Sequence, residues 1–119
     1  MEISLYGTDG KPTMYIADDG ETIYTWDGYA VCYLVNDQIY GWRGKHLGWF
    51  LNDIVYDLDG YRIGYTREAS TRILYTERTK WTKKTTRTKS TRLSARTQPT
   101  LKTSDSKVDL AEYLGQNKG

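Results

Sequence analysis

The sequence predicts an all-β fold in which four repeated β-hairpins form an eight-strand meander around a pseudo-fourfold axis, followed by an extended basic arm and a short C-terminal helix. Three observations support this prediction. A twelve-residue unit recurs four times within residues 1–66. Each unit has a glycine turn between two β-rich runs. The chain also has 11 Tyr and 4 Trp beside one Phe, and such residues suit strands with one apolar and one wet side.

The four units align without gaps on three columns. They read LYGTDGKPTMYI (5–16), IYTWDGYAVCYL (23–34), IYGWRGKHLGWF (39–50) and VYDLDGYRIGYT (55–66). The second column is always Tyr, the sixth is always Gly and the eleventh is always a large aromatic residue. Glycine adopts the positive φ that a tight hairpin turn needs. Further turn signals at 18–20, 36–37 and 52–53 join the hairpins into one meander.

The length of each hairpin turn decides which residues face the core. A two-residue turn would pair column four with seven and column two with nine, which places columns two, four, nine and eleven on one face. On this interpretation the tyrosines and tryptophans form the core where the hairpins meet, with aliphatic and small residues on the other face. The alternative is a three-residue turn, which would shift the register and turn one strand over. Radial closure would leave no long exposed edge.

These motifs resemble those of a known family. The runs WDGYAVCYL, GKHLGWF and VYDLDGYRIGYT are similar to the 4-fold β flower family of small bacterial domains, over about residues 3–66. The resemblance implies the fold, with four hairpins around a pseudo-fourfold axis, and it implies no activity and no site residues. The first unit departs from the pattern at Thr8 and at Pro12 in its return strand, and proline there suits an edge position.

The charge divides the chain into parts. Residues 1–66 hold four basic and ten acidic residues, a net of −6, whereas residues 67–119 hold thirteen basic and five acidic residues, a net of +8. We therefore predict a repeat domain over 1–66, a basic Thr-rich arm over 67–104, and a docking helix and tail over 105–119. The arm is too poor in aliphatic residues to order itself alone, and only Ile73 to Tyr75 favour a short strand.

The arm supplies the candidate residues for binding a partner or a polyanion. A dense set of cations with one tryptophan would attract phosphates in a salt-dependent way. The set comprises Arg72, Arg78, Lys80, Trp81, Lys83, Lys84, Arg87, Lys89, Arg92 and Arg96. The other interpretations are a solvated linker and a strap on the acidic domain of the same chain.

A short helix is predicted near the C-terminus. Ser106 and Asp109 have the spacing of a capping box, with Asp in place of Glu or Gln. An apolar face would follow, formed by Val108, Ala111, Tyr113 and Leu114. A helix this short is marginal alone, so we expect it to dock on its own domain or on a partner.

No motif predicts catalysis, a metal site or a cofactor. The best candidate for a small-ligand site is the rim of the third unit, with Trp42, Arg43, Lys45 and the single histidine, His46. A lone histidine is more often structural than a ligand. Turn chemistry accounts for Asp9, Asp27 and Asp59, Asp57 belongs to no calcium-loop motif, and Cys32 is expected to be a buried structural thiol.

Three functions follow from this pattern. The leading hypothesis is a non-enzymatic protein-interaction or scaffold module whose arm is ordered by a protein partner or a larger assembly such as a virion. The alternative is a protein that binds nucleic acid or another polyanion through the arm, and the third is a small-ligand binder or enzyme using the rim near His46. The chain shows no signal peptide and no membrane span, which favours the cytoplasm. Arms exchanged between copies would give a homo-oligomer.

Overall fold

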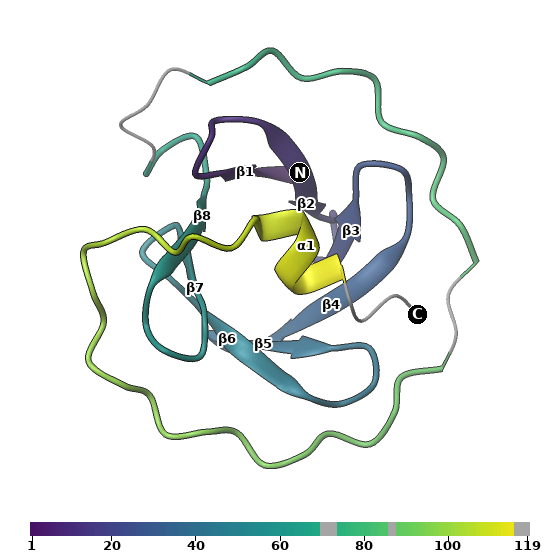
Figure 1. Cartoon of the computed structure of the whole chain (residues 1–119). Helices are drawn as coiled ribbons and strands as arrows, with labels where there is room; N and C mark the ends of the chain where they lie inside the picture. The colour runs from purple at the N-terminus through teal and green to yellow at the C-terminus, as the bar shows by residue number, and fades with distance from the viewer. Residues whose placement is uncertain (70–73, 86–87, 116–119) are drawn as a thin grey trace.

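The computed structural model describes residues 1–69, 74–85 and 88–115, and it contains a closed antiparallel β-barrel of eight strands (Figure 1). Each strand pairs with the next along the chain, and the last returns to the first. This confirms the predicted all-β fold of four hairpins. The strands are β1 (Ile3–Gly7), β2 (Pro12–Ile16), β3 (Thr22–Thr25), β4 (Ala30–Val35), β5 (Gln38–Gly41), β6 (His46–Leu51), β7 (Ile54–Tyr56) and β8 (Arg62–Tyr65).

Each hairpin closes with a three-residue turn, so the predicted two-residue turn is wrong. In the first hairpin the N–H of Gly7 donates to the carbonyl of Lys11 at 3.0 Å, and Gly10 has a φ of 84°. The extra turn residue makes a β-bulge. Leu5 therefore pairs with Met14, whereas Tyr6 pairs with Pro12. The same register shift recurs in the other three hairpins, so the alternative turn length is the correct one.

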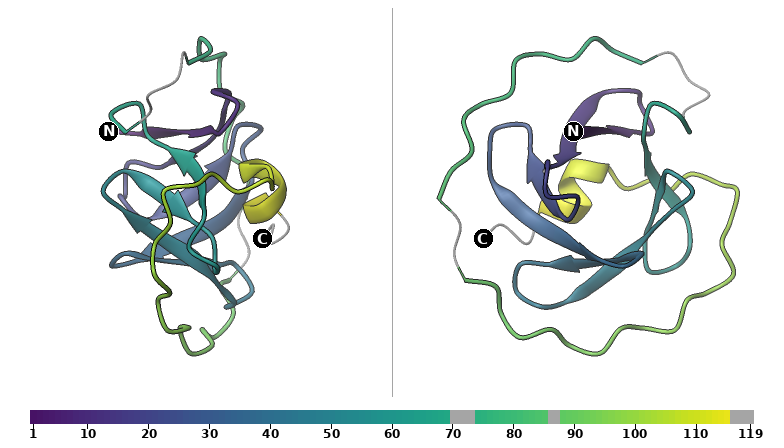
Figure 2. Two further views of the ribbon diagram at one scale, coloured as in Figure 1. Left: turned by 60° about the vertical axis from the view of Figure 1, so that its left-hand side comes forward. Right: turned by 180° about the vertical axis from the view of Figure 1, so that it is seen from behind.

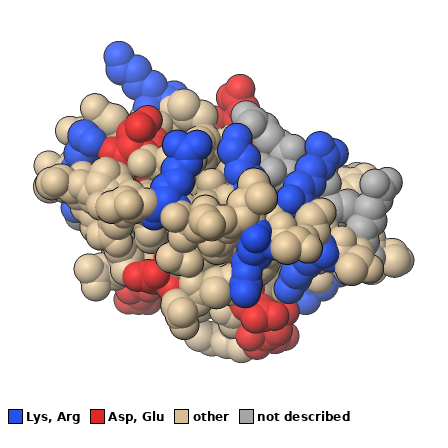
Figure 3. Space-filling model, turned by 90° about the horizontal axis from the view of Figure 1, so that it is seen from below, with Lys and Arg blue, Asp and Glu red and all other residues tan. Residues whose placement is uncertain are grey.

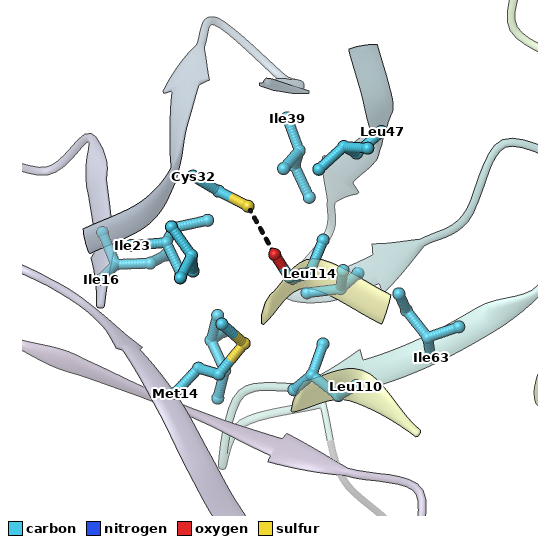
Figure 4. Packing of buried hydrophobic residues seen from close by; sticks show 12 residues of the cluster. Met14, Ile16, Ile23, Cys32, Ile39, Leu47, Ile63, Leu110 and Leu114 are labelled. Carbon is cyan, nitrogen blue, oxygen red and sulfur yellow. Dashed lines mark hydrogen bonds between the residues drawn. The ribbon is translucent and has the colours of Figure 1, made fainter. Parts of the chain in front are cut away.

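The interior of the barrel is aliphatic, which corrects the predicted aromatic core. The buried members of the central cluster come from columns one, nine, ten and twelve of the repeat and from the C-terminal helix, and include no Tyr or Trp (Figure 4). Beyond the bulge, column one pairs with column ten, as in Leu5 with Met14, which is also the pairing that a two-residue turn would give. The two faces of the sheet are therefore largely as predicted, but the face with the aliphatic residues is the one turned inward, joined by column nine at the bulge. The buried members of the cluster are Leu5, Met14, Ile16, Ile23, Val31, Cys32, Ile39, Leu47, Val55, Ile63, Leu110 and Leu114.

The tyrosines and tryptophans form a second layer on the outside of the barrel. Column eleven of one hairpin pairs with column two of the next, as in Tyr15 with Tyr24 and Tyr33 with Tyr40. Both of these pairs stack, with ring centroids 5.6 Å and 6.0 Å apart. Tyr65 pairs with Tyr6 and so continues this pattern where the barrel closes.

Helix α1 (Leu110–Gly115) covers one end of the barrel (Figure 2). Leu110 and Leu114 enter the aliphatic interior and are 1 % and 0 % exposed, which shows that the helix docks on its own domain. Asp109 caps the helix by accepting from the N–H of Glu112 at 3.2 Å, so the predicted capping box is wrong. Val108 precedes the helix and is 41 % exposed, because the helix begins later than predicted.

The other predicted residues of the docking helix are placed by the same geometry. Ala111 and Tyr113 are half-buried on the helix. The hydroxyl of Tyr113 donates to the carbonyl of Leu47 at 2.8 Å, and the Cys32 thiol donates to the carbonyl of Leu114 at 3.7 Å (Figure 4). Burial raises the pKa of the Cys32 thiol, and such a neutral thiol packs as a small apolar group.

Candidate interaction surface

The basic arm runs around the barrel as an extended belt, which we define as residues 74–85 and 88–105 (Figure 1). Its backbone is fastened to the glycine of each hairpin turn. Main-chain N–H groups nine residues apart donate to these glycine carbonyls at 2.8 to 3.0 Å. The pairs are Tyr75 with Gly10, Lys84 with Gly28, Leu93 with Gly44, and Lys102 with Gly60.

The belt approaches the turns of the last three hairpins too closely for any residue other than glycine. A Cβ added to Gly28 would lie 2.3 Å from the carbonyl oxygen of Thr82, and one added to Gly44 would lie 2.2 Å from that of Thr91. The invariant glycine therefore serves both the positive φ of the turn and the contact with the belt.

The arm is itself a repeat of nine residues, which the sequence reasoning missed. It reads LYTERTKWT (74–82), KKTTRTKST (83–91), RLSARTQPT (92–100) and LKTSDSKVD (101–109). A ring 37 Å across has a quarter circumference of about 29 Å, and nine extended residues span about 30 Å. One extended unit therefore fits each quarter of the barrel. A search for the fourfold period within the arm would have revealed this signal.

The lysines of the belt lie over aromatic rings of the barrel. Lys80 lies 4.6 Å from the ring centroid of Tyr15 and 5.0 Å from that of Trp26. One repeat later, Lys89 lies 4.4 Å from Tyr33 and 5.2 Å from Trp42. Each ring pair is edge-to-face, and cations are attracted to the faces of such rings. We call these two sites the aromatic cages.

The side chains of the belt and the barrel also vary together beside the fourth hairpin. The position equivalent to Trp26 and Trp42 is Leu58, and the position equivalent to Lys80 and Lys89 is Gln98. The cation is thus absent beside Leu58, whereas in the quarter where Thr8 replaces the tryptophan the equivalent belt position is Lys107. The main-chain bonds to the four turn glycines assign each repeat of the belt to one quarter of the barrel.

In a second row of cation–ring contacts, the cation comes from the belt in two quarters and from the barrel in a third. In two quarters a belt lysine lies over a turn tyrosine, with Lys84 over Tyr29 at 4.7 Å and Lys102 over Tyr61 at 4.5 Å. In the first quarter the cation is on the turn and the ring is on the belt, with Lys11 5.8 Å from the ring of Tyr75. The outer aromatic layer and the belt are therefore complementary along much of the ring.

Ion pairs add to these contacts. Glu2 accepts from Lys80 at 2.9 Å and lies 3.4 Å from Lys83. The hydrogen bond from Lys80 lowers the pKa of Glu2, whereas burial raises the pKa of Tyr15 to about 12. The acidic repeat domain and the basic arm therefore meet within one chain, as the strap interpretation anticipated.

His46 fastens the belt to the third hairpin. Its Nε2 donates to the carbonyl of Gly48 at 2.9 Å, and its Nδ1 accepts from the main-chain N–H of Arg96 at 3.0 Å. Burial lowers the pKa of His46, which favours the neutral ring. Both nitrogens are thus engaged in structural hydrogen bonds. Of the other predicted rim residues, Trp42 is buried, while Arg43 and Lys45 are exposed on the turn.

The remaining arm candidates differ in their surroundings. Arg78 and Arg96 are exposed, and their guanidinium groups make no hydrogen bond or ion pair within the described residues. Trp81 is 67 % exposed. Arg72 and Arg87 lie outside the described residues, as does Ile73 of the predicted short strand, and Leu74 and Tyr75 form no strand.

The family model described as 4-fold beta flower protein matches residues 3–114. The chain belongs to the 4-fold β flower family. The match extends past the expected residues 3–66 and includes the belt and most of α1. The β flower chain matches no curated protein and no solved structure.

The described part of this β flower protein offers no metal centre. It contains no group of three or more His, Cys, Asp or Glu side chains that could hold an ion. Among the same residues, no helix has the length and apolar character needed to cross a membrane.

The cages predict a modest but specific contribution to stability. Replacing Lys89 by Gln removes the charge above Tyr33 and Trp42, and we expect the free energy of unfolding to fall by about 0.5–1 kcal/mol. Chemical denaturation measures this change. The matched control is Lys107→Gln, which removes a charge from an exposed lysine without a ring beneath it. Equal effects of the two substitutions would contradict the cage.

Proposed function

We propose that the protein is a non-enzymatic interaction module that recognises a protein partner through the outer face of its belt. The observation that carries this proposal is the exposure of large apolar side chains on the belt. Trp81 is 67 %, Leu93 64 % and Tyr75 57 % exposed. Exposed tryptophan is uncommon, and tryptophan and tyrosine are frequent anchors of protein interfaces.

The inner face of the belt supports the same proposal. Its lysines and main-chain N–H groups are engaged by the barrel, so the outer face presents side chains on a backbone fixed at regular intervals. Since the barrel itself holds the belt, no partner is needed to place it. A partner would meet a surface that is already ordered, which reduces the entropy cost of binding.

The test is a capture experiment with the full chain immobilised in a nuclease-treated lysate of its native host. We expect a captured protein to be lost when Trp81→Ala and Leu93→Ala are combined, because the substitutions remove the exposed anchors. The matched control is Ile3→Ala with Val108→Ala, which removes exposed apolar side chains outside the belt. Capture that is unchanged by the belt substitutions would contradict the proposal.

A second candidate function, polyanion binding through the arm, is favoured by one observation. Arg78 and Arg96 project from the belt with no acidic partner among the described residues. Exposed cations gather in one quarter of the ring, around the turn of the third hairpin, and such binding would concentrate there.

A further inference from the structure

The third hairpin breaks the fourfold pattern of charge. The residue before the turn glycine is aspartate in three hairpins, Asp9, Asp27 and Asp59, and arginine in the third, Arg43. Asp9 helps its turn by accepting from the main-chain N–H of Lys11 at 3.0 Å. The Arg43 side chain has no such bond and is exposed, so turn formation does not explain it.

The belt brings two more arginines to the same turn. The main-chain N–H of Leu93 donates to the carbonyl of Gly44 at 2.8 Å, which places Arg92 beside the turn. The main-chain N–H of Arg96 donates to His46 at 3.0 Å. Arg43, Lys45, Arg92 and Arg96 are all exposed, and we call them the cationic corner. Figure 3 shows the molecule from below the view of Figure 1, with many Lys and Arg side chains and a few acidic ones on that face.

The equivalent corner of the fourth quarter lacks these four cations. The repeat alignments place Asp59 where the third quarter has Arg43, and Asp105 where it has Arg96. Tyr61 and Leu101 stand in place of Lys45 and Arg92. The third corner thus holds four cations, whereas the fourth corner holds two carboxylates and one cation, Lys102, although both corners use the same belt-to-glycine bond. The fold does not require the charge of the third corner.

We propose that the cationic corner binds the phosphate backbone of a nucleic acid. Three of its four cations are arginines, whose planar guanidinium groups bind two phosphate oxygens together. Beside the corner is a hollow of about 450 Å³ lined in part by Lys89, Arg92 and Glu21. The proposal extends the polyanion candidate and does not depend on the apolar anchors of the belt.

The test measures how binding of a 20-base-pair DNA duplex by the full chain depends on salt. Four phosphate contacts predict a slope of log affinity against log salt near −3.6, since each contact contributes about −0.9. Affinity should therefore fall about 150-fold between 50 and 200 mM salt, and only about 12-fold for Arg43→Gln with Lys45→Gln, which leaves two contacts. Fluorescence anisotropy measures both values.

The matched control is Lys11→Gln with Lys107→Gln, which changes the net charge equally but lies outside the corner, and it should keep the slope of the original chain. A second variant, Arg96→Gln, keeps the main-chain bond to His46 and should reduce the slope by about 0.9. No binding of the duplex at 50 mM salt would overturn the proposal. A control slope reduced as far as that of the corner variant would overturn it too.

Polyglutamate serves as the probe for an acidic protein surface. Weaker binding of polyglutamate than of the duplex supports a phosphate site, and equal or tighter binding overturns it. These results are separate from the capture experiment, which uses nuclease and varies Trp81 and Leu93. Failure of either proposal is therefore recognisable without the other.

Discussion

A chain that ends at Thr66 is expected to be largely unfolded, although it contains all eight strands. Leu110 and Leu114 would be missing from the interior, and loss of a buried leucine costs about 2–5 kcal/mol, or roughly 4–10 kcal/mol for two. A domain of this size has a total stability of only about 3–10 kcal/mol. The outer aromatic layer would also lose the belt that covers it.

Circular dichroism and denaturant titration measure this effect. A chain ending at Gly115 is the matched control, because it keeps the belt and α1, and it should unfold like the full chain. In the full chain, Leu110→Ala with Leu114→Ala isolates the contribution of the helix. Cooperative unfolding of the short chain at the midpoint of the full chain would show instead that residues 1–66 are autonomous, as the division at Thr66 predicts.

The hairpins could be predicted because their signals are local. The spacing of Tyr, Gly and a second aromatic residue in each unit reports the turn and both strands together. The register was more difficult, because Asp-Gly is compatible with turns of two or three residues. The bulge restores the pairing beyond the turn, so Tyr15 and Leu5 lie on opposite faces with either turn length. The pattern of the repeat did not show which of these two faces turns inward.

The role of the arm was less accessible to sequence reasoning. Composition described residues 67–104 as basic and unable to fold alone, and the structure shows the barrel as the surface that holds the belt. Charge supported this interpretation but did not select it from the alternatives. The nine-residue period selects it, because it matches Lys80 and Lys89 to rings and Gln98 to Leu58.

The residues of the candidate rim site have different roles in the structure. His46, as the single histidine, drew attention as an acid, a base or a ligand. The structure places both of its nitrogens in hydrogen bonds that close the third quarter of the belt. Its neighbours Arg43 and Lys45 remain exposed and belong to the cationic corner.

Acidification is expected to release the third quarter of the belt through His46. Nδ1 accepts a hydrogen bond from Arg96, and protonation would place a second hydrogen between these two nitrogens. Burial also lowers the pKa of the folded state below the ordinary value of 6.5. The stability from the neutral ring is therefore fully present above pH 6.5, and it is lost as the pH falls through the folded pKa.

The free energy of unfolding lost on acidification has an upper limit, and it can be assigned to one residue. One proton gives a slope of at most about 1.4 kcal/mol per pH unit, and His46 is the only histidine in the chain. Unfolding free energies between pH 5 and 8 measure the slope, and exchange of the Arg96 amide hydrogen locates it. His46→Gln, which offers a donor and an acceptor without titrating, should flatten the profile near pH 6. A profile unchanged by this substitution would mean that the bond between Arg96 and His46 does not hold the belt in solution.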